Sequence, residues 1–216
     1  MTKLFAAAGI LVAAAGANAA FTLNSVDLGG DSASFGSPIT TSTSYYQDGF
    51  GNNYPPSAAF IGFFPSLQDD SYIAMDSMGG STSTYTASSP GGSTPGFSAT
   101  AGHFADAATL TGGYFTGGGV ASGNDPFGGN GVMIAQLTTT GSLTGSNIRV
   151  NTQGDFTGTR SLVLNGADNG GLYALAYEAR SGQNGTTYEI WVTDAPTPGA
   201  AALLGLAGLA GVRRRR

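Results

Sequence analysis

The segment GLYALAYEARSGQNGTTYEIWVT at positions 171–193 contains two runs of alternating apolar residues. A period of two is that of a β-strand with one face turned toward a core. The core-facing members of the two runs are Tyr173, Leu175 and Tyr177, then Tyr188, Ile190 and Val192. Between the runs lies GQNG at 182–185, which is rich in turn-forming residues. The segment therefore predicts two strands joined by a turn.

Short runs of the same kind recur through the chain, at 58–64, 71–75, 132–139 and 161–165. Turn signals rich in Gly, Asn and Asp separate them, at 28–31, 48–53, 124–131 and 165–171. Glycine makes up 36 of the 216 residues, and charged residues only 10%, which favours strands and turns over helices. The pattern predicts an all-β body, an antiparallel β-sandwich with jelly-roll-like character. No amphipathic helix is expected between the two ends of the chain.

Two glycine-rich or polar stretches interrupt this pattern. STSTYTASSPGGSTPG at 81–96 is of low complexity and predicts a long surface loop, a site of O-linked sugar or an edge strand. TGGYFTGGG at 111–119 lacks the Lys and the following helix of a phosphate loop. Its glycines are expected to permit bulges or close packing within a β-structure.

The charges are distributed unevenly along the chain. Lys3 and Arg213 to Arg216 lie at the ends, so the segment 20–194 holds three arginines against all 13 acidic residues, a net charge of −10. So acidic a body would repel phosphate backbones, and nucleic acid is not an expected partner. The chain has no cysteine, which excludes disulfides, thiolate metal sites and cysteine nucleophiles.

The first 19 residues have the order of a secretory signal. Lys3 precedes an apolar run from Leu4 to Ala15, and Ala17-Asn18-Ala19 supplies the small residues that signal peptidase needs, so cleavage is expected after Ala19. The alternative is a buried N-terminal helix. The order of charge, apolar run and cleavage site favours export.

The last 22 residues combine a proline motif, an apolar run and a cluster of arginines. Residues 195–212 are 18 uncharged residues, about 27 Å as a helix, which is barely enough for the roughly 30 Å hydrocarbon core. Arg213, Arg214, Arg215 and Arg216 follow and are expected to stop transfer and stay in the cytoplasm. The alternatives are a temporary hold during sorting and a plain C-terminal membrane tail.

This three-part order, PTPG at 196–199, an Ala/Leu/Gly helix and a terminal Arg cluster, resembles the PEP-CTERM sorting signal of bacterial surface proteins. The resemblance implies that the C-terminal helix holds the chain transiently at the membrane, and that a membrane sorting enzyme, exosortase, cuts near Pro196, Thr197, Pro198 and Gly199 and releases or transfers the body to the surface. The family's usual motif has Glu where this chain has Thr197. The resemblance covers about a tenth of the chain and leaves the body unassigned.

Catalytic constellations in the body are weak. His103 is the only histidine, and no G-x-S-x-G elbow is present. Two carboxylate pairs could be nominated for glycoside hydrolysis, Asp69 with Asp70 and Glu178 with Glu189. Adjacent strand residues point to opposite faces, so Asp69 and Asp70 would diverge in a strand. The body is therefore expected to have no enzymatic activity, no catalytic residue and no cofactor.

Two kinds of binding site remain open. Oxygen-rich turns could hold calcium, and the candidate ligands are Asn124, Asp125, Asn130, Asp168 and Asn169. Asn and Asp also favour turns without any metal. Aromatic residues gather between Tyr45 and Phe64. Of these, Phe60, Phe63 and Phe64 are expected in the core, whereas Tyr45, Tyr46 and Tyr54 could form a surface that stacks against sugars.

The sequence thus predicts three parts: a signal peptide at 1–19, a β-sandwich body at 20–194 and a sorting signal at 195–216. The expected function is that of a non-enzymatic surface or extracellular-matrix protein, exported and sorted through its C-terminus. The alternatives are a carbohydrate-binding sandwich that contacts extracellular polysaccharide and a secreted polysaccharide-active enzyme.

Overall fold

The computed structural model describes residues 20–29, 36–51, 54–76, 96–98, 108–154, 158–167 and 173–194. The predicted signal peptide, the loop at 81–95, His103, Asp168, Asn169 and the sorting signal at 195–216 lie outside the described residues. The described chain is mostly β-structure in antiparallel sheets with almost no helix, as the alternating pattern predicts.

The strands form three sheets. The first has the order β11-β10-β1-β6, made of Gly158–Leu162, Ile148–Gly154, Phe21–Asp27 and Gly113–Ala121. The second has the order β12-β13-β14-β8-β3, made of Gly166–Ala167, Ala174–Gly182, Gly185–Thr193, Asn130–Thr139 and Tyr72–Asp76, and β7 (Gly123–Asn124) also pairs with β8. The third and smallest has the order β4-β5-β2-β9, made of Gly96–Ser98, Thr109–Thr111, Ile39–Thr41 and Leu143–Gly145.

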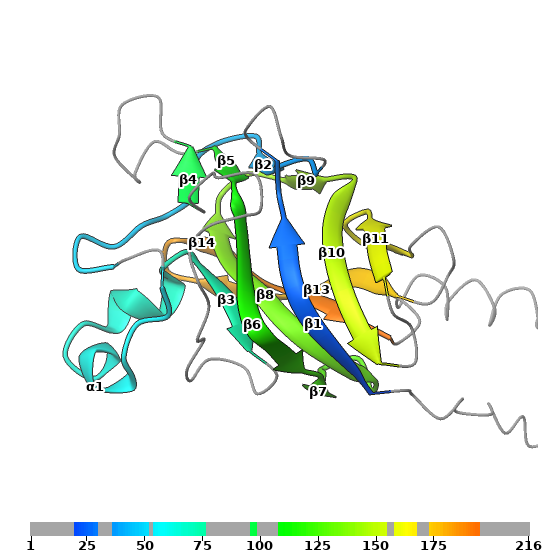
Figure 1. The fold of residues 1–216 in the computed structure, drawn as a ribbon. Helices are drawn as coiled ribbons and strands as arrows, with labels where there is room; N and C mark the ends of the chain where they lie inside the picture. The colour runs from blue at the N-terminus through cyan, green and yellow to red at the C-terminus, as the bar shows by residue number, and fades with distance from the viewer. Residues whose placement is uncertain are drawn as a thin grey trace, which may run out of the picture.

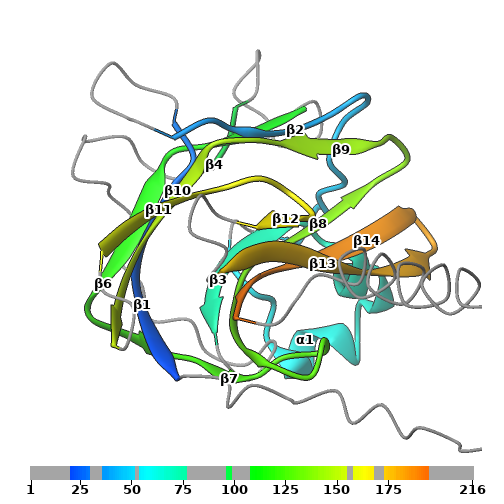
Figure 2. The same ribbon diagram turned by 90° about the vertical axis from the view of Figure 1, so that its right-hand side faces the viewer.

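All three sheets contribute to one hydrophobic core. The first and second sheets lie on opposite sides of it, and the third closes one end (Figure 1, Figure 2). Leu23 and Val150 reach the core from the first sheet, and Leu175 and Ile190 from the second. The hydroxyl of Tyr114 on β6 donates a hydrogen bond to the carbonyl of Ile134 on β8 at 2.7 Å, which ties the two large sheets together.

The two alternating runs within residues 171–193 form the longest pairing in the second sheet. β13 and β14 are antiparallel, with Tyr177 opposite Ile190 and Gly182 opposite Gly185. The predicted core-facing residues of both runs belong to the main core cluster, with Tyr177 and Tyr188 packed at its margin. The predictions at 71–75 and 132–139 are confirmed as β3 and β8, whereas the run at 161–165 is a strand only as far as Leu162.

The run AAFIGFF at 58–64 is not the strand that its composition suggests. Ala58–Ile61 is a single helical turn (α1), and Pro65–Asp69 is a 3-10 helix (η1). Pro55 and Pro56 precede the run and Pro65 follows it closely, so the segment is bounded by residues that lack a backbone N–H for a sheet ladder.

The glycine cluster at 111–119 forms a bulge in β6. Leu23 pairs with Val120 and Ser25 with Phe115, so four residues of β6 lie opposite Asn24 alone. Gly119 has φ +71, and a Cβ there would lie 2.3 Å from the Cγ2 of Thr22. The expectation that these glycines permit a bulge is confirmed.

Two neighbouring glycines test this bulge. Gly119→Ala is expected to lower the free energy of unfolding by about 1–2 kcal/mol, because alanine would adopt a left-handed conformation and displace Thr22. Gly118 has open space around its Cα, so Gly118→Ala should change stability by no more than about 0.5 kcal/mol. Urea unfolding of the purified full chain compares them, and equal losses would contradict the assignment.

Candidate binding site on the outer face of the second sheet

Strand β8 is buried on both faces, although a sheet that covers a single core buries only one face of its strands. Residues 131–139 are all buried. One face of β8 meets the main core. On the other face Met133 packs with Tyr72, Ala74 and Trp191, and Gln136 bonds to the segment formed by residues 46–51 and 54–70, which we call the lobe. In Figure 1 the lobe, with α1, stands beside β3 at the edge of the sheets. The outer face of the second sheet and the lobe over it form the candidate site.

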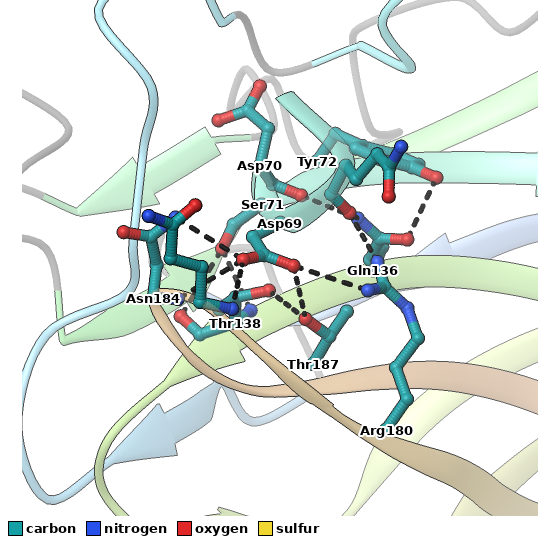
Figure 3. Close-up of polar contacts among 11 residues, drawn as sticks. Asp69, Asp70, Ser71, Tyr72, Gln136, Thr138, Arg180, Asn184 and Thr187 are labelled. Carbon is teal, nitrogen blue, oxygen red and sulfur yellow. Dashed lines mark hydrogen bonds and ion pairs between the residues drawn. The ribbon is translucent and has the colours of Figure 1, made fainter. Parts of the chain in front are cut away.

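Asp69 at the end of η1 anchors the lobe to the turn between β13 and β14. The residue is only 4% exposed, and its carboxylate accepts hydrogen bonds from the backbone N–H groups of Gln183 at 2.8 Å and Asn184 at 3.1 Å. Asn184 Nδ2 donates to the same oxygen, and Arg180 forms an ion pair at 3.2 Å (Figure 3). A Cβ on Gly182 would lie 2.3 Å from this carboxylate, so the turn and Asp69 fit closely.

Gln136 on β8 is the second anchor. Its Nε2 donates hydrogen bonds to the carbonyls of Gln68 at 3.0 Å and Asp70 at 2.8 Å. The hydroxyl of Tyr72 donates to its Oε1 at 3.3 Å (Figure 3). Arg180 also donates to the carbonyl of Gln68. The nitrogen of this buried amide thus holds the lobe to the sheet, while its oxygen is held by Tyr72 on the neighbouring strand β3.

Asp70 and Asp48 order the interior of the lobe. Asp70 is fully buried and accepts a hydrogen bond from the backbone N–H of Asp48 at 2.9 Å. Desolvation acts to raise the pKa of Asp48, but hydrogen bonds from Ser66, the Phe50 N–H and Tyr46 outweigh it and lower that pKa. Asp69 and Asp70 leave the chain in different directions (Figure 3), so they do not form a catalytic pair.

The lobe exposes four large aromatic side chains, which we call the aromatic patch: Phe50 at 71%, Tyr54 at 45%, Phe60 at 59% and Phe63 at 81%. In the part of the chain that the structure describes, Val163 is the only other large apolar side chain so exposed. Phe50 stacks on the half-buried Phe64 with ring centroids 4.4 Å apart and an interplanar angle of 28°. The patch is therefore concentrated on one short segment.

The structure corrects the sequence-based assignment of these aromatic residues. Phe60 and Phe63 were expected in the core and are exposed, because they lie on α1 and the turn after it rather than on a strand. Tyr45 is 1% exposed, and its hydroxyl donates to the carbonyl of Ile39 at 2.9 Å, so its ring cannot stack against a sugar. Tyr46 is half-buried and donates to Asp48, whereas Tyr54 is exposed.

A cavity of about 240 Å³ lies between the lobe and the sheet. Its walls come from the lobe at Pro56, Ile61, Leu67 and Gln68, and from the sheet at Tyr72, Met133, Gln136, Arg180 and Glu189. Glu189 lies opposite Glu178 on β13. Burial and the charge of Glu178 raise the pKa of Glu189, while Arg180 acts to lower it. The two glutamates therefore differ in environment, and only Glu189 lines the cavity.

Asp125, the described turn carboxylate that was suggested for calcium, accepts hydrogen bonds from its own turn and from β14. Asp125 accepts hydrogen bonds from the backbone N–H groups of Phe127 at 2.9 Å and Gly129 at 2.8 Å, and from the hydroxyl of Thr193. Asn130 donates through its backbone N–H and its side chain to Asp194, while Asn124 is exposed on β7. Among the described residues, no group of three or more His, Cys, Asp or Glu side chains is placed to hold a metal ion.

Comparisons of the chain with protein-family models, curated proteins and solved structures give no match. Within the described ranges, no helix has the length and apolar character needed to cross a bilayer. The expected membrane helix at 195–212 lies outside those ranges.

Proposed function

We propose that the body is a non-enzymatic carbohydrate-binding module of an exported surface or extracellular-matrix protein. The observation that carries the proposal is the aromatic patch: four large exposed rings within residues 50–63 of the lobe. Exposed rings stack on the C–H faces of sugars, and the adjacent polar cavity offers groups for hydroxyls. The acidic body favours polysaccharide over nucleic acid as the partner.

The role of Asp69 and Asp70 favours binding over hydrolysis. Both carboxylates act in holding the lobe, and neither lines the cavity. We further propose that the body is a jelly-roll-like β-sandwich, a proposal supported by two large antiparallel sheets that share one core. In such a body, the lobe would be an insertion that carries the ligand surface.

The double variant Phe60→Ala/Phe63→Ala tests the proposed function. Each ring contributes about 0.5–1.5 kcal/mol to stacking, so the pair should raise Kd for a bound polysaccharide roughly tenfold. The measurement is affinity electrophoresis of the full chain through gels that contain dextran, xylan or glycol chitosan at two salt concentrations. Val163→Ala, an exposed position away from the lobe, should migrate like the wild type. Retardation that is equal in both variants would contradict binding by the patch.

We propose that the ends of the chain direct it to the surface, through the signal peptide cleaved after Ala19 and the sorting signal at 195–216. The apolar run barely spans a bilayer, while each arginine at a helix centre costs about 2.5–3.5 kcal/mol, so Arg213 to Arg216 should resist being pulled through. Replacing all four with Ser should release uncut chain, whereas Pro196→Ala/Pro198→Ala should leave it membrane-bound. Intact mass after membrane fractionation separates these outcomes, and wild-type behaviour of both would contradict the assignment.

A further inference from the structure

The cavity under the lobe contains one carboxylate that receives no hydrogen bond from the described residues. This carboxylate belongs to Glu189 on β14, which is half-buried. The neighbouring polar side chains already hold the lobe: Gln136 donates to Asp70, and Arg180 donates to Asp69. Buried charges are ordinarily paired with a donor. Glu189 is therefore the group in the cavity that remains available to a ligand.

The charges around the cavity favour a cationic ligand. Glu178 lies opposite Glu189 on β13, and Arg180, the one cation beside them, is already paired with Asp69. Three carboxylates against one guanidinium leave a local net charge of −2. Burial and the neighbouring Glu178 charge raise the pKa of Glu189, which means that its ionised form lacks stabilisation that a positive group would supply.

The remaining walls suit a small ring. Pro56, Ile61, Leu67 and Met133 present apolar surface, while the volume of about 240 Å³ is below the roughly 300 Å³ at which pockets begin to accept drug-sized molecules. The cavity also lies under the segment that carries the aromatic patch, since Pro56 and Ile61 flank Phe60 in the chain. A ligand in the cavity could therefore continue onto the patch.

We propose that this cavity binds one amino-sugar ring of an extracellular polysaccharide, with the ammonium group of the ring donating hydrogen bonds to Glu189. The C–H face of the ring lies against Ile61 and Met133. This inference rests on the proposed carbohydrate-binding function and adds to it the class of sugar. Charge-assisted hydrogen bonds are about twice as strong as neutral ones, which gives the cavity its preference for an ammonium over a hydroxyl.

Titration of the purified full chain with glucosamine, glucose and N-acetylglucosamine, followed by NMR, tests the inference. Glucosamine should bind roughly tenfold or more tightly than either neutral sugar. Glu189→Gln should abolish this preference, because it keeps the shape of the side chain and removes the charge. Glu178→Gln is the comparison variant: it removes a neighbouring exposed carboxylate outside the cavity, so it should reduce the preference less than Glu189→Gln does.

The pH dependence gives a second reading that does not depend on a variant. The pKa of Glu189 is raised, so glucosamine binding should weaken as the pH falls through that pKa and the carboxylate is neutralised. The charged groups that act on Glu189 are Glu178 and Arg180, and Arg180 is itself paired with Asp69. Equal binding of all three sugars, or a Glu189→Gln variant that still prefers glucosamine, overturns the inference. Polysaccharide binding that depends on Phe60 and Phe63 would then leave the proposed function standing.

Discussion

Replacing Asp69 with alanine is expected to lower the free energy of unfolding by about 3–5 kcal/mol. The carboxylate is buried and accepts from two backbone N–H groups in the turn between β13 and β14, from Asn184 Nδ2 and from Arg180. Without it, the buried acceptor that joins η1 to this turn is lost, and each of its donors left unsatisfied costs about 1–3 kcal/mol. Urea unfolding of the full chain measures the loss.

The Arg180→Ala variant shows which contacts of Asp69 matter. The Arg180 side chain is 41% exposed, so its ion pair should contribute about 1 kcal/mol or less. Asp69→Asn keeps the shape of the side chain and one acceptor oxygen. Its loss of stability should therefore lie between those of Asp69→Ala and Arg180→Ala. A loss for Arg180→Ala as large as that for Asp69→Ala would show that the ion pair, and not the turn N–H groups, anchors the lobe.

The Gln136→Met variant is expected to lower the free energy of unfolding by about 2–3 kcal/mol and to loosen the lobe. Methionine has a similar shape but cannot donate to the carbonyls of Gln68 and Asp70 or accept from Tyr72. Hydrogen exchange should therefore accelerate at the amide of Leu67 in the lobe, which donates to Phe64, and at that of Ser71, which follows the lobe and donates to Tyr46 within it. Amides in the β1–β10 pairing should keep their protection relative to global unfolding.

The same substitution at an exposed position supplies the control. Gln153 lies on β10, away from the lobe, so Gln153→Met should change stability by no more than about 0.5 kcal/mol. If Gln136→Met is as mild as Gln153→Met, the lobe is held by its apolar contacts instead of by this amide.

The strands of the second sheet were predictable because their alternation follows directly from burial. Tyr173, Leu175 and Tyr177 face the core as the period of two requires. The outer face of β14 was less predictable: Trp191 packs with Tyr72, Ala74 and Met133 in a second small cluster. A strand buried on both faces loses the clean contrast between polar and apolar positions, so its second burial cannot be read from periodicity alone.

The lobe was not predictable, for two physical reasons. Its run of apolar residues between prolines resembles a buried strand in composition, and nothing local shows that Phe60 and Phe63 are exposed. Its anchors also join residues far apart in the chain: Asp69 meets Gln183 and Asn184 across more than 110 positions. The prolines at 55, 56 and 65, which bound the run, were the available sign that residues 58–64 do not continue a sheet.

Carbohydrate binding at the lobe is tested most directly by amide chemical-shift mapping of the full chain with an oligosaccharide of whichever polysaccharide it binds. The predicted result is a set of changes at Phe50, Tyr54, residues 60–64, Gln68 and Glu189, all on or under the lobe. Changes confined to β1, β6, β10 and β11 would place the ligand on the first sheet, across the core from the lobe, and would contradict the proposed site.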